Sequence, residues 1–187
     1  MPGLRVIAGK AKGRKLKMVL GEGTRPVPAR VKEALFNIIG SDIIEAQFLD
    51  LFAGTGSVAI EALSRGASYC HLVDHDRKAI RIIHENLKAT GFEDQAEVLL
   101  TDSFIYIRSK SLRRFDYIYI APPQYQELWS KTVEAVDNGP RIMNPDAWVI
   151  VQIDPNEYRV LLLDNLVEFD QRKYGNTLLV FYEFPGE

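Results

Sequence analysis

Cysteine and histidine are scarce in this 187-residue chain, which contains one cysteine and three histidines. A single cysteine excludes an internal disulfide and a zinc site built on several thiolates. Cys70 stands in the apolar run at residues 69–73, a setting typical of a buried structural thiol rather than a nucleophile. The histidines, His71, His75 and His84, lack the spacing of metal ligands, so we expect structural or surface roles for them and no metal site.

Long apolar runs are also lacking. No segment approaches the roughly 18 to 20 apolar residues that cross a bilayer. Residues 1–17 are basic and do not contain the apolar core of a signal peptide. The composition, with 47% hydrophobic and 26% charged residues, is that of an ordinary globular domain. We therefore expect no contact with a membrane and a location in the cytoplasm, or in the plastid stroma if a transit peptide has been removed.

Positive charge is concentrated at the start of the chain. The net charge of −2 conceals nine Lys and Arg against one acidic residue in residues 1–32, a local charge of +8 that leaves −10 on the rest. Cations that neutralise phosphates release condensed counterions, so a basic arm on an acidic body predicts a polyanionic partner. The alternative is a solvated charged hairpin, but the interspersed glycines favour nucleic acid. The residues predicted to bind RNA are Arg5, Lys10, Lys12, Arg14, Lys15, Lys17, Arg25 and Arg30.

The hydrophobic pattern changes after the basic arm. Residues 4–8 and 14–19 alternate approximately around glycines, which predicts a basic β-hairpin, and a helix is predicted from about Pro28. Strand-like and helix-like segments then alternate, as in a parallel, doubly wound sheet with helices on both faces. The predicted strands are 48–52, 69–73, 96–100, 117–120 and 148–153, and the predicted helices are 57–65, 77–89, 102–109 and 126–137.

The end of the chain has a different pattern, because residues 167–173 and 177–184 predict a closing antiparallel hairpin. We therefore predict an α/β, Rossmann-like fold with a mostly parallel seven-stranded sheet and a C-terminal antiparallel hairpin. Residues 1–40 are expected to form an extension with the basic hairpin and a helix, and residues 41–187 the main domain.

A glycine-rich turn follows the first strand of the predicted sheet. Gly54 and Gly56 permit unusual dihedrals and let a ligand approach the backbone closely. Ligands in open α/β sheets collect beyond the carboxyl ends of the strands, so we place a cofactor site here. Residues 54–59 also satisfy the G-x-G-x-x-A form of the dinucleotide fingerprint. The turn alone therefore fits either a dinucleotide or the methionine end of S-adenosylmethionine.

Carboxylates accompany successive strands. Asp74 ends the second predicted strand, where an acid can accept hydrogen bonds from ribose hydroxyls, and Asp76 competes for that role. Asp102 follows the third strand and precedes Ser103; it can reach an adenine amine, or serve as a helix N-cap. Asp50 lies within the first strand, and burying an unpaired carboxylate costs several kcal/mol. We therefore expect Asp50 at the ligand edge, facing the methionine amino group or the loop amides.

After the fourth predicted strand the chain reads Ala121-Pro122-Pro123-Gln124-Tyr125, where amino-group methyltransferases commonly carry Asp/Asn-Pro-Pro-aromatic. With this loop the chain resembles the RsmD family, which methylates a guanine N2 amine in small-subunit ribosomal RNA. The resemblance spans nearly the whole chain. Its motifs are Arg5-Val6-Ile7-Ala8-Gly9, Thr24-Arg25-Pro26, Val31-Lys32-Glu33-Ala34-Leu35-Phe36-Asn37, the block from Leu49 to Gly66, and Gly175-Asn176-Thr177.

The resemblance implies that residues 41–187 form an S-adenosylmethionine-dependent methyltransferase domain. Its substrate would be 16S-type small-subunit rRNA, in partly assembled subunits, with the basic hairpin and the loop at 24–26 facing the RNA. Asp74 would lie at the cofactor's ribose and Asp102 near its adenine. We expect a monomer that takes part in rRNA processing. The predicted cofactor-binding residues are Asp50, Phe52, Ala53, Gly54, Gly56, Asp74, Asp102 and Ser103.

The methyl-acceptor loop departs from the family pattern. The usual Asp-Pro-Pro-Tyr/Phe reads Ala121-Pro122-Pro123-Gln124 here, and the aromatic residue follows one place later at Tyr125. Because the lone pair of an exocyclic purine amine is delocalised into the ring, the enzyme has to orient the amine at the methyl group. The usual carboxylate and the proline carbonyl do this by accepting the amine hydrogens. Ala121 offers no acceptor, whereas the Pro122 carbonyl remains.

The missing carboxylate is expected to slow a methyltransferase and need not inactivate it. A hydrogen bond to a charged group contributes about 1.5 to 3 kcal/mol, which corresponds to roughly ten- to 150-fold in rate. Gln124, through its amide oxygen, and Asp154, at the next strand end, are candidates to compensate. Tyr125 is a candidate to stack on a flipped base, and the alternative is a loop aromatic packed on the helix that follows. The residues assigned to the acceptor site are Ala121, Pro122, Pro123 and Tyr125.

Other functions also fit parts of the sequence. A non-catalytic RNA-binding or ribosome-assembly module would keep the fold after losing the acid at position 121, and would bind RNA without turnover. An amino-methyltransferase acting on DNA or another nucleobase fits as well, because a proline-proline loop does not distinguish guanine N2 from adenine N6 or cytosine N4. A nicotinamide dehydrogenase fits the glycine turn alone and leaves the proline loop and the basic arm unexplained.

Overall fold

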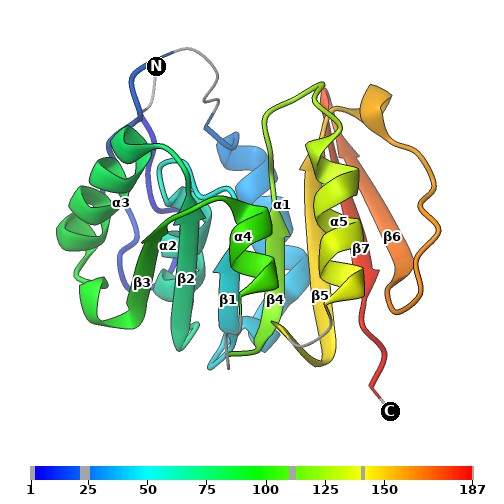
Figure 1. Ribbon diagram of the computed structural model, residues 1–187. Helices are drawn as coiled ribbons and strands as arrows, with labels where there is room; N and C mark the ends of the chain where they lie inside the picture. Colours follow the sequence, from blue (N-terminus) through cyan, green and yellow to red (C-terminus); the bar gives the residue numbers. More distant parts are fainter. Residues whose placement is uncertain (1–2, 22–25, 110–112, 140–141, 187) are drawn as a thin grey trace.

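Seven strands form one sheet in the order β3-β2-β1-β4-β5-β7-β6 (Figure 1). This computed structural model describes residues 3–21, 26–109, 113–139 and 142–186. The strands β1 to β5 pair in parallel, and β7 runs antiparallel to both β5 and β6. The predicted Rossmann-like sheet with a C-terminal antiparallel hairpin is therefore confirmed. The strands are β1 Gln47–Asp50, β2 Tyr69–Asp74, β3 Ala96–Leu100, β4 Phe115–Ile120, β5 Met143–Ile153, β6 Val167–Tyr174 and β7 Thr177–Glu183.

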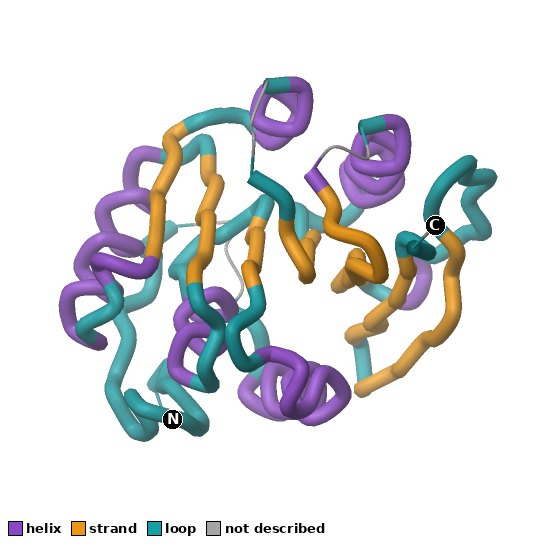
Figure 2. Tube along the Cα trace, turned by 90° about the horizontal axis from the view of Figure 1, so that it is seen from below, coloured by secondary structure: helices purple, strands orange, loops and turns teal. Residues whose placement is uncertain are grey.

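Helices cover both faces of the sheet (Figure 2). Side chains alternate along the strands, so Phe48 packs in the same apolar cluster as α1, α2 and α3, while its neighbour Leu49 packs with α4 and α5. The predicted strand β5 starts too late, because Met143 already pairs with Phe115 across a β-bulge. The helices are α1 Ala29–Ile39, α2 Ser57–Ser64, α3 Arg77–Thr90, α4 Ser103–Arg108 and α5 Leu128–Asn138, with short 3-10 helices η1 Gly40–Ile43, η2 Glu93–Gln95 and η4 Pro155–Glu157.

The basic segment at residues 4–17, hereafter the basic loop, forms a short antiparallel hairpin and not the two full-length strands predicted for it. It contains one antiparallel bridge, between Arg5 and Lys15. The amides of Ile7 and Ala8, next to this bridge, donate to the Glu61 carboxylate of α2, at 2.8 and 3.1 Å. Around that bridge the Val6 amide donates to the Arg14 carbonyl at 3.0 Å and the Leu16 amide to the Leu4 carbonyl at 2.8 Å, so the predicted hairpin pairing is present over a few residues.

A buried ion pair between Lys32 and Glu61 also holds the basic loop against the core. Lys32 of α1 is 1% exposed and lies 3.3 Å from the Glu61 carboxylate. Its ammonium also donates to the Arg5 carbonyl and the Ser57 hydroxyl, each at 2.8 Å. Burial lowers the pKa of Lys32, and Glu61 opposes that shift. Since Val6 and other loop residues share one apolar cluster with α1, α2 and the sheet, the N-terminal extension packs as part of the main core.

Candidate active site

A pocket of about 710 Å³ lies at the carboxyl ends of the parallel strands, within the usual size range of small-molecule sites. One wall is the glycine turn after β1 with the end of β2. The opposite wall is the proline loop, defined here as residues 121–127, with the end of β5. Met18 and Val19, directly after the basic loop, and Pro26 and Val27 add an apolar edge. The predicted cofactor turn and the predicted acceptor loop therefore face one cavity.

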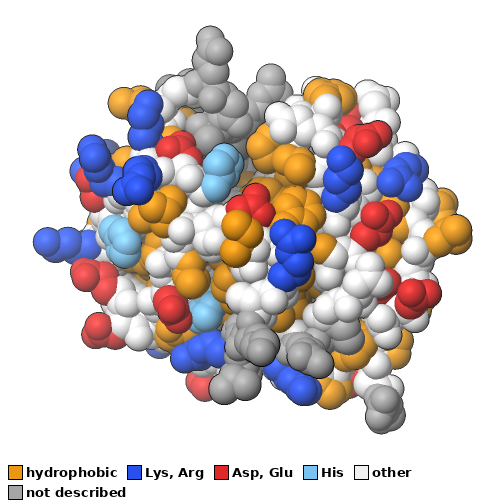
Figure 3. All heavy atoms as spheres, in the orientation of Figure 1, with side chains coloured by type: hydrophobic (Ala, Val, Ile, Leu, Met, Phe, Trp, Pro, Cys, Tyr) orange, Lys and Arg blue, Asp and Glu red, His pale blue; other side chains and the backbone are white. Residues whose placement is uncertain are grey.

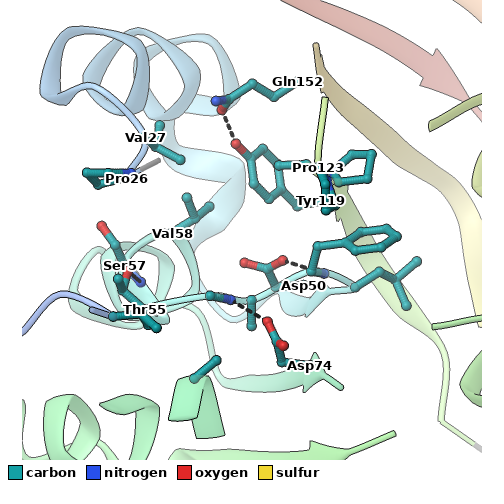
Figure 4. Close-up of a pocket in the computed structure, with 18 of the residues that line it drawn as sticks. Pro26, Val27, Asp50, Thr55, Ser57, Val58, Asp74, Tyr119, Pro123 and Gln152 are labelled. Atoms are coloured by element: carbon teal, nitrogen blue, oxygen red, sulfur yellow. Dashed lines mark hydrogen bonds between the residues drawn. The ribbon is translucent and has the colours of Figure 1, made fainter. Parts of the chain in front are cut away.

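Asp50 ends β1 inside this pocket, as expected for a carboxylate at the ligand edge (Figure 4). It is 1% exposed, and one of its oxygens accepts the N–H of Phe52 at 3.1 Å. Burial raises the pKa of Asp50 to about 7, against the lowering effect of the Phe52 amide, and the charge of Asp74 raises it further. A cationic group bound nearby would stabilise the ionised form of this carboxylate.

The amides of the glycine turn bond within the protein. Gly54 donates to the Asp74 carboxylate at 2.9 Å, Ala53 to the Val73 carbonyl at 2.9 Å, and Gly56 to the Ala53 carbonyl at 2.8 Å. The turn therefore lacks the row of ligand-facing amides that a pyrophosphate needs. Gly54 itself, with φ +56°, has nothing within 4 Å of an added Cβ, so a ligand can approach its backbone.

The charge of the pocket distinguishes between a dinucleotide and S-adenosylmethionine, the two cofactors that fit the glycine turn. Asp50, Asp74 and Asp76 line it, and none of its described lining residues is Lys or Arg. Three carboxylates without a cation disfavour the pyrophosphate of a dinucleotide and favour a ligand with positive groups. S-adenosylmethionine carries two such groups, an ammonium and a sulfonium. The donor and acceptor set of this wall thus fits S-adenosylmethionine.

The acids after β2 and β3 have different surroundings. Asp74 accepts the Gly54 amide with one oxygen and the Asp76 amide with the other, both at 2.9 Å, which fixes its carboxylate at the pocket wall. Asp76 lines the pocket too and caps α3 by accepting the Lys78 amide. Asp102 caps α4 and is not among the lining residues, whereas Ser103 lines the pocket. Both capping bonds of Asp102 go to Oδ1.

The proline loop brings Ala121, Pro122 and Pro123 to the pocket. Tyr125 is not one of its lining residues and is 66% exposed. It adopts φ +61°, its amide donates to Glu157 at 2.7 Å, and its hydroxyl donates to Asp154 at 2.9 Å. Tyr125 therefore lies toward η4 in this structure. The same bond engages Asp154, which the sequence suggested as a compensating acceptor.

Sequence reasoning missed several residues that line the pocket, among them Tyr119 and Gln152. Tyr119 of β4 is 1% exposed, and its hydroxyl donates to the side-chain oxygen of Gln152 near the end of β5 (Figure 4). Both line the pocket. Burial raises the pKa of Tyr119 well above its usual range, and the charge of Asp50 adds to that effect. The sequence did offer a signal for Gln152, because it is a polar residue within the apolar run of β5, as Asp50 is within that of β1.

The predicted RNA-binding side chains lie outside the pocket. Arg5, Lys10, Lys12, Arg14, Lys15, Lys17 and Arg30 are exposed, and Arg25 lies outside the described residues. Lys17 pairs with Glu85 at 2.8 Å. The basic loop is packed on α2, whereas the opposite face, with α4 and α5, mixes acidic and basic side chains (Figure 3). The cations of the basic loop therefore lie on the α2 side, where the loop leads into the pocket wall.

The described ranges contain neither a membrane-spanning helix nor a cluster of metal ligands. No helix there is long and apolar enough to cross a membrane. Within the same ranges, no three or more His, Cys, Asp or Glu residues are grouped as metal ligands. Cys70 is completely buried, and burial raises the pKa of its thiol well above the usual range, which confirms a structural thiol.

The chain is similar to known proteins in sequence and in fold. The family model described as "Conserved hypothetical protein 95" matches residues 4–183. The chain is 35% identical to "Putative rRNA methyltransferase YlbH" of Bacillus subtilis, over 98% of this chain and 100% of that protein. It is 35% identical to "Ribosomal RNA small subunit methyltransferase D" of Escherichia coli, over 73% of this chain and 68% of that protein. The solved structure "Putative methyltransferase yhhF from Escherichia coli" matches with a TM-score of 0.87, 26% identity and 100% of both chains.

Proposed function

The chain belongs to the RsmD family, whose model covers residues 4–183, and from this premise we propose that it methylates the exocyclic N2 amine of a guanine in small-subunit rRNA. By family and fold it is an S-adenosylmethionine-dependent rRNA methyltransferase. The guanine amine and the small-subunit particle are the finer parts of the proposal. One observation carries it: the acidic cofactor wall and the proline loop line a single pocket.

The pocket residues divide into roles at the cofactor. S-adenosylmethionine supplies a methyl group on a positively charged sulfur. Asp50 is proposed to accept hydrogen bonds from the ammonium group, and its burial makes a cationic partner especially favourable. Asp74 is proposed to accept the ribose hydroxyls, since its carboxylate is already fixed by two amides. Ser103 lines the pocket on the adenine side, with Asp102 beside it. Phe52, Ala53 and Gly54 line the part of the turn on which the methionine end would lie. Gly56 belongs to the same turn but does not line the pocket, and its Cα faces Leu72 and Ile83.

The acceptor side has to orient a weak nucleophile. The amine nitrogen forms a bond to the methyl carbon while the carbon–sulfur bond breaks, and the sulfur keeps the bonding electron pair. The amine then loses a proton to an acceptor or to water. The Pro122 carbonyl is proposed to accept one amine hydrogen, and the two prolines restrict the backbone that presents it. Tyr125 would have to leave Asp154 to stack on a flipped base.

The basic loop is proposed to hold the RNA. Its exposed cations lie on the α2 side of the molecule, and the chain passes directly from Lys17 to the pocket residues Met18 and Val19. A polyanion bound along the loop would thus lead toward the pocket. The proposed partner is small-subunit rRNA in partly assembled subunits, and the protein is proposed to act as a monomer.

A single-turnover assay tests this function. Methyl-labelled S-adenosylmethionine is mixed with excess enzyme and with small subunits or rRNA that lack the modification. We expect label in the RNA, and none with Asp50→Asn, which removes the proposed ammonium partner. Cofactor binding and salt-dependent RNA binding without transfer would instead indicate a non-catalytic assembly module. Transfer to DNA at a higher rate than to rRNA would indicate a different nucleobase substrate.

A further inference from the structure

Gln152 stands beside the position from which the family's usual carboxylate is missing. The parallel strands β4 and β5 pair Tyr119 with Ile150 and Ile120 with Val151. Continuing this register by one residue places Ala121 next to Gln152. Side chains alternate along each strand, so these two residues lie on the same face of the sheet as the pair Tyr119 and Ile150. The contacts agree, because Tyr119, Ile150 and Ala121 all pack in the cluster on the α1–α2 face.

The amide of Gln152 is held in one orientation. Its oxygen accepts the hydroxyl of Tyr119, which is 1% exposed and therefore fixed by the surrounding core. Figure 4 shows the two side chains pointing toward one another between Val27 and Pro123. An amide oxygen has two lone pairs, so it can accept a second hydrogen bond while the first persists. Gln152 and Ala121 both line the pocket, and the short alanine side chain leaves the neighbouring space free.

The other candidate acceptors are less suitable. Asp154 is not among the pocket-lining residues, and it already accepts the Tyr125 hydroxyl and the Asn156 amide. Gln124 lines the pocket but is an exposed residue of the proline loop. Asp50 belongs to the opposite, cofactor-binding wall. Gln152, of these candidates, combines a pocket position, a place beside residue 121 and a fixed side-chain oxygen.

We propose that the side-chain oxygen of Gln152 accepts a hydrogen of the substrate amine and so replaces the carboxylate missing at position 121, with Tyr119 as the positioning residue that orients the amide. The inference rests on the proposed function, because it requires an amine as methyl acceptor. A neutral amide oxygen does not take the proton from the amine. It orients the nitrogen lone pair at the methyl carbon together with the Pro122 carbonyl.

Combined substitutions test this role. Gln152→Met keeps the length and apolar volume but removes the acceptor, and we expect the single-turnover rate on the substrate RNA to fall about tenfold. Gln152→Glu keeps an acceptor and should retain at least the wild-type rate. Adding Ala121→Asp should accelerate Gln152→Met more than it accelerates the wild type, because the new carboxylate restores the lost acceptor. Gln171→Met, on the exposed edge strand β6, is the matched control.

Binding and folding are measured on the same proteins. Cofactor affinity by calorimetry should be unchanged in Gln152→Met, whereas its melting temperature should fall because the buried Tyr119 hydroxyl loses its acceptor. Tyr119→Phe should slow transfer by a smaller factor than Gln152→Met does. If Gln152→Met does not fold, Gln152→Glu and Tyr119→Phe decide, and wild-type rates in Tyr119→Phe with a loss in Gln152→Glu would overturn the proposal.

The outcomes separate this inference from the proposed function. An inactive wild type would refute both. An active wild type with an unchanged rate in Gln152→Met would refute only the role of Gln152. So would an equal acceleration by Ala121→Asp in both backgrounds, because independent sites contribute additively. A selective rescue of Gln152→Met by Ala121→Asp is the expected result.

Discussion

Asp50→Asn separates the effect of a buried charge on folding from its effect on cofactor binding. Burial raises the pKa of Asp50 from its ordinary value of 3.8 to about 7. A carboxyl with a higher pKa in the folded chain binds more protons there than in the unfolded chain. The free energy of unfolding therefore falls as the pH rises between about 4 and about 7, and the full loss is present above pH 7.

The size of this effect follows from the shift. Each pKa unit corresponds to about 1.4 kcal/mol, so roughly three units correspond to about 4 kcal/mol of stability lost by the cofactor-free protein. The amide of the Asp50→Asn variant cannot ionise and is free of this loss. The stability of Asp50→Asn relative to the wild type should therefore rise by about 1.4 kcal/mol per pH unit from pH 5 to pH 7 and then level off.

Urea unfolding of the cofactor-free proteins at pH 5 to 8 measures this difference. Calorimetry with S-adenosylmethionine measures the pH dependence of cofactor binding, which arises because a bound ammonium favours the ionised carboxylate of Asp50. The wild-type dissociation constant should increase by up to about tenfold per unit as the pH falls below 7, whereas the weaker binding of Asp50→Asn should vary much less. A stability difference independent of pH would refute the reasoning, as would equal pH dependence of binding in the two proteins.

Other parts of the structure give separate tests. Gly9→Ala puts a Cβ 1.9 Å from a backbone carbonyl of α2, whereas Gly13 has a similar φ and nothing within 4 Å of an added Cβ. Urea unfolding should therefore show that Gly9→Ala loses at least about 1 kcal/mol more unfolding free energy than Gly13→Ala. Equal losses would argue against the packing of the basic loop. Glu61→Gln leaves the Lys32 ammonium buried without its counter-charge and should lower the unfolding free energy by about 3 to 5 kcal/mol; an unchanged value would contradict the ion pair's structural role. Lys12→Glu should reduce the slope of log affinity for RNA against log salt by about 0.7 per lost phosphate contact, and an unchanged slope would place that part of the loop away from the RNA.

The sequence predicted the sheet well because buried parallel strands are recorded as short apolar runs separated by amphipathic helices. Asp50 and Asp74 were identified because each carboxylate stands in or at the end of such an apolar run, where a buried charge requires a partner. Their roles at the cofactor remain predictions. The pairing of Tyr119 with Gln152 was not predictable, because it depends on the adjacency of β4 and β5 and on their register.

Local patterns failed where tertiary contacts determine the backbone. The alternation in the basic loop predicted strands at 4–8 and 14–19, but the antiparallel pairing is confined to the residues around Arg5 and Lys15, and the amides of Ile7 and Ala8 donate to Glu61 of α2. Tyr125 looked like a base-stacking or helix-packing residue. Its positive φ and its bond to Asp154 come from contacts with a segment 29 positions away. Neither contact leaves a signal in the sequence near these residues.

The most direct test of the central claim is the identity of the methylated nucleoside. Small subunits that lack the modification are incubated with the protein and isotopically methyl-labelled S-adenosylmethionine, and the rRNA is digested and analysed by mass spectrometry. The account predicts labelled N2-methylguanosine from the small-subunit rRNA, formed by the wild type and not by Asp50→Asn. A labelled adenosine or cytidine, or unlabelled rRNA at saturating enzyme and cofactor, would contradict it.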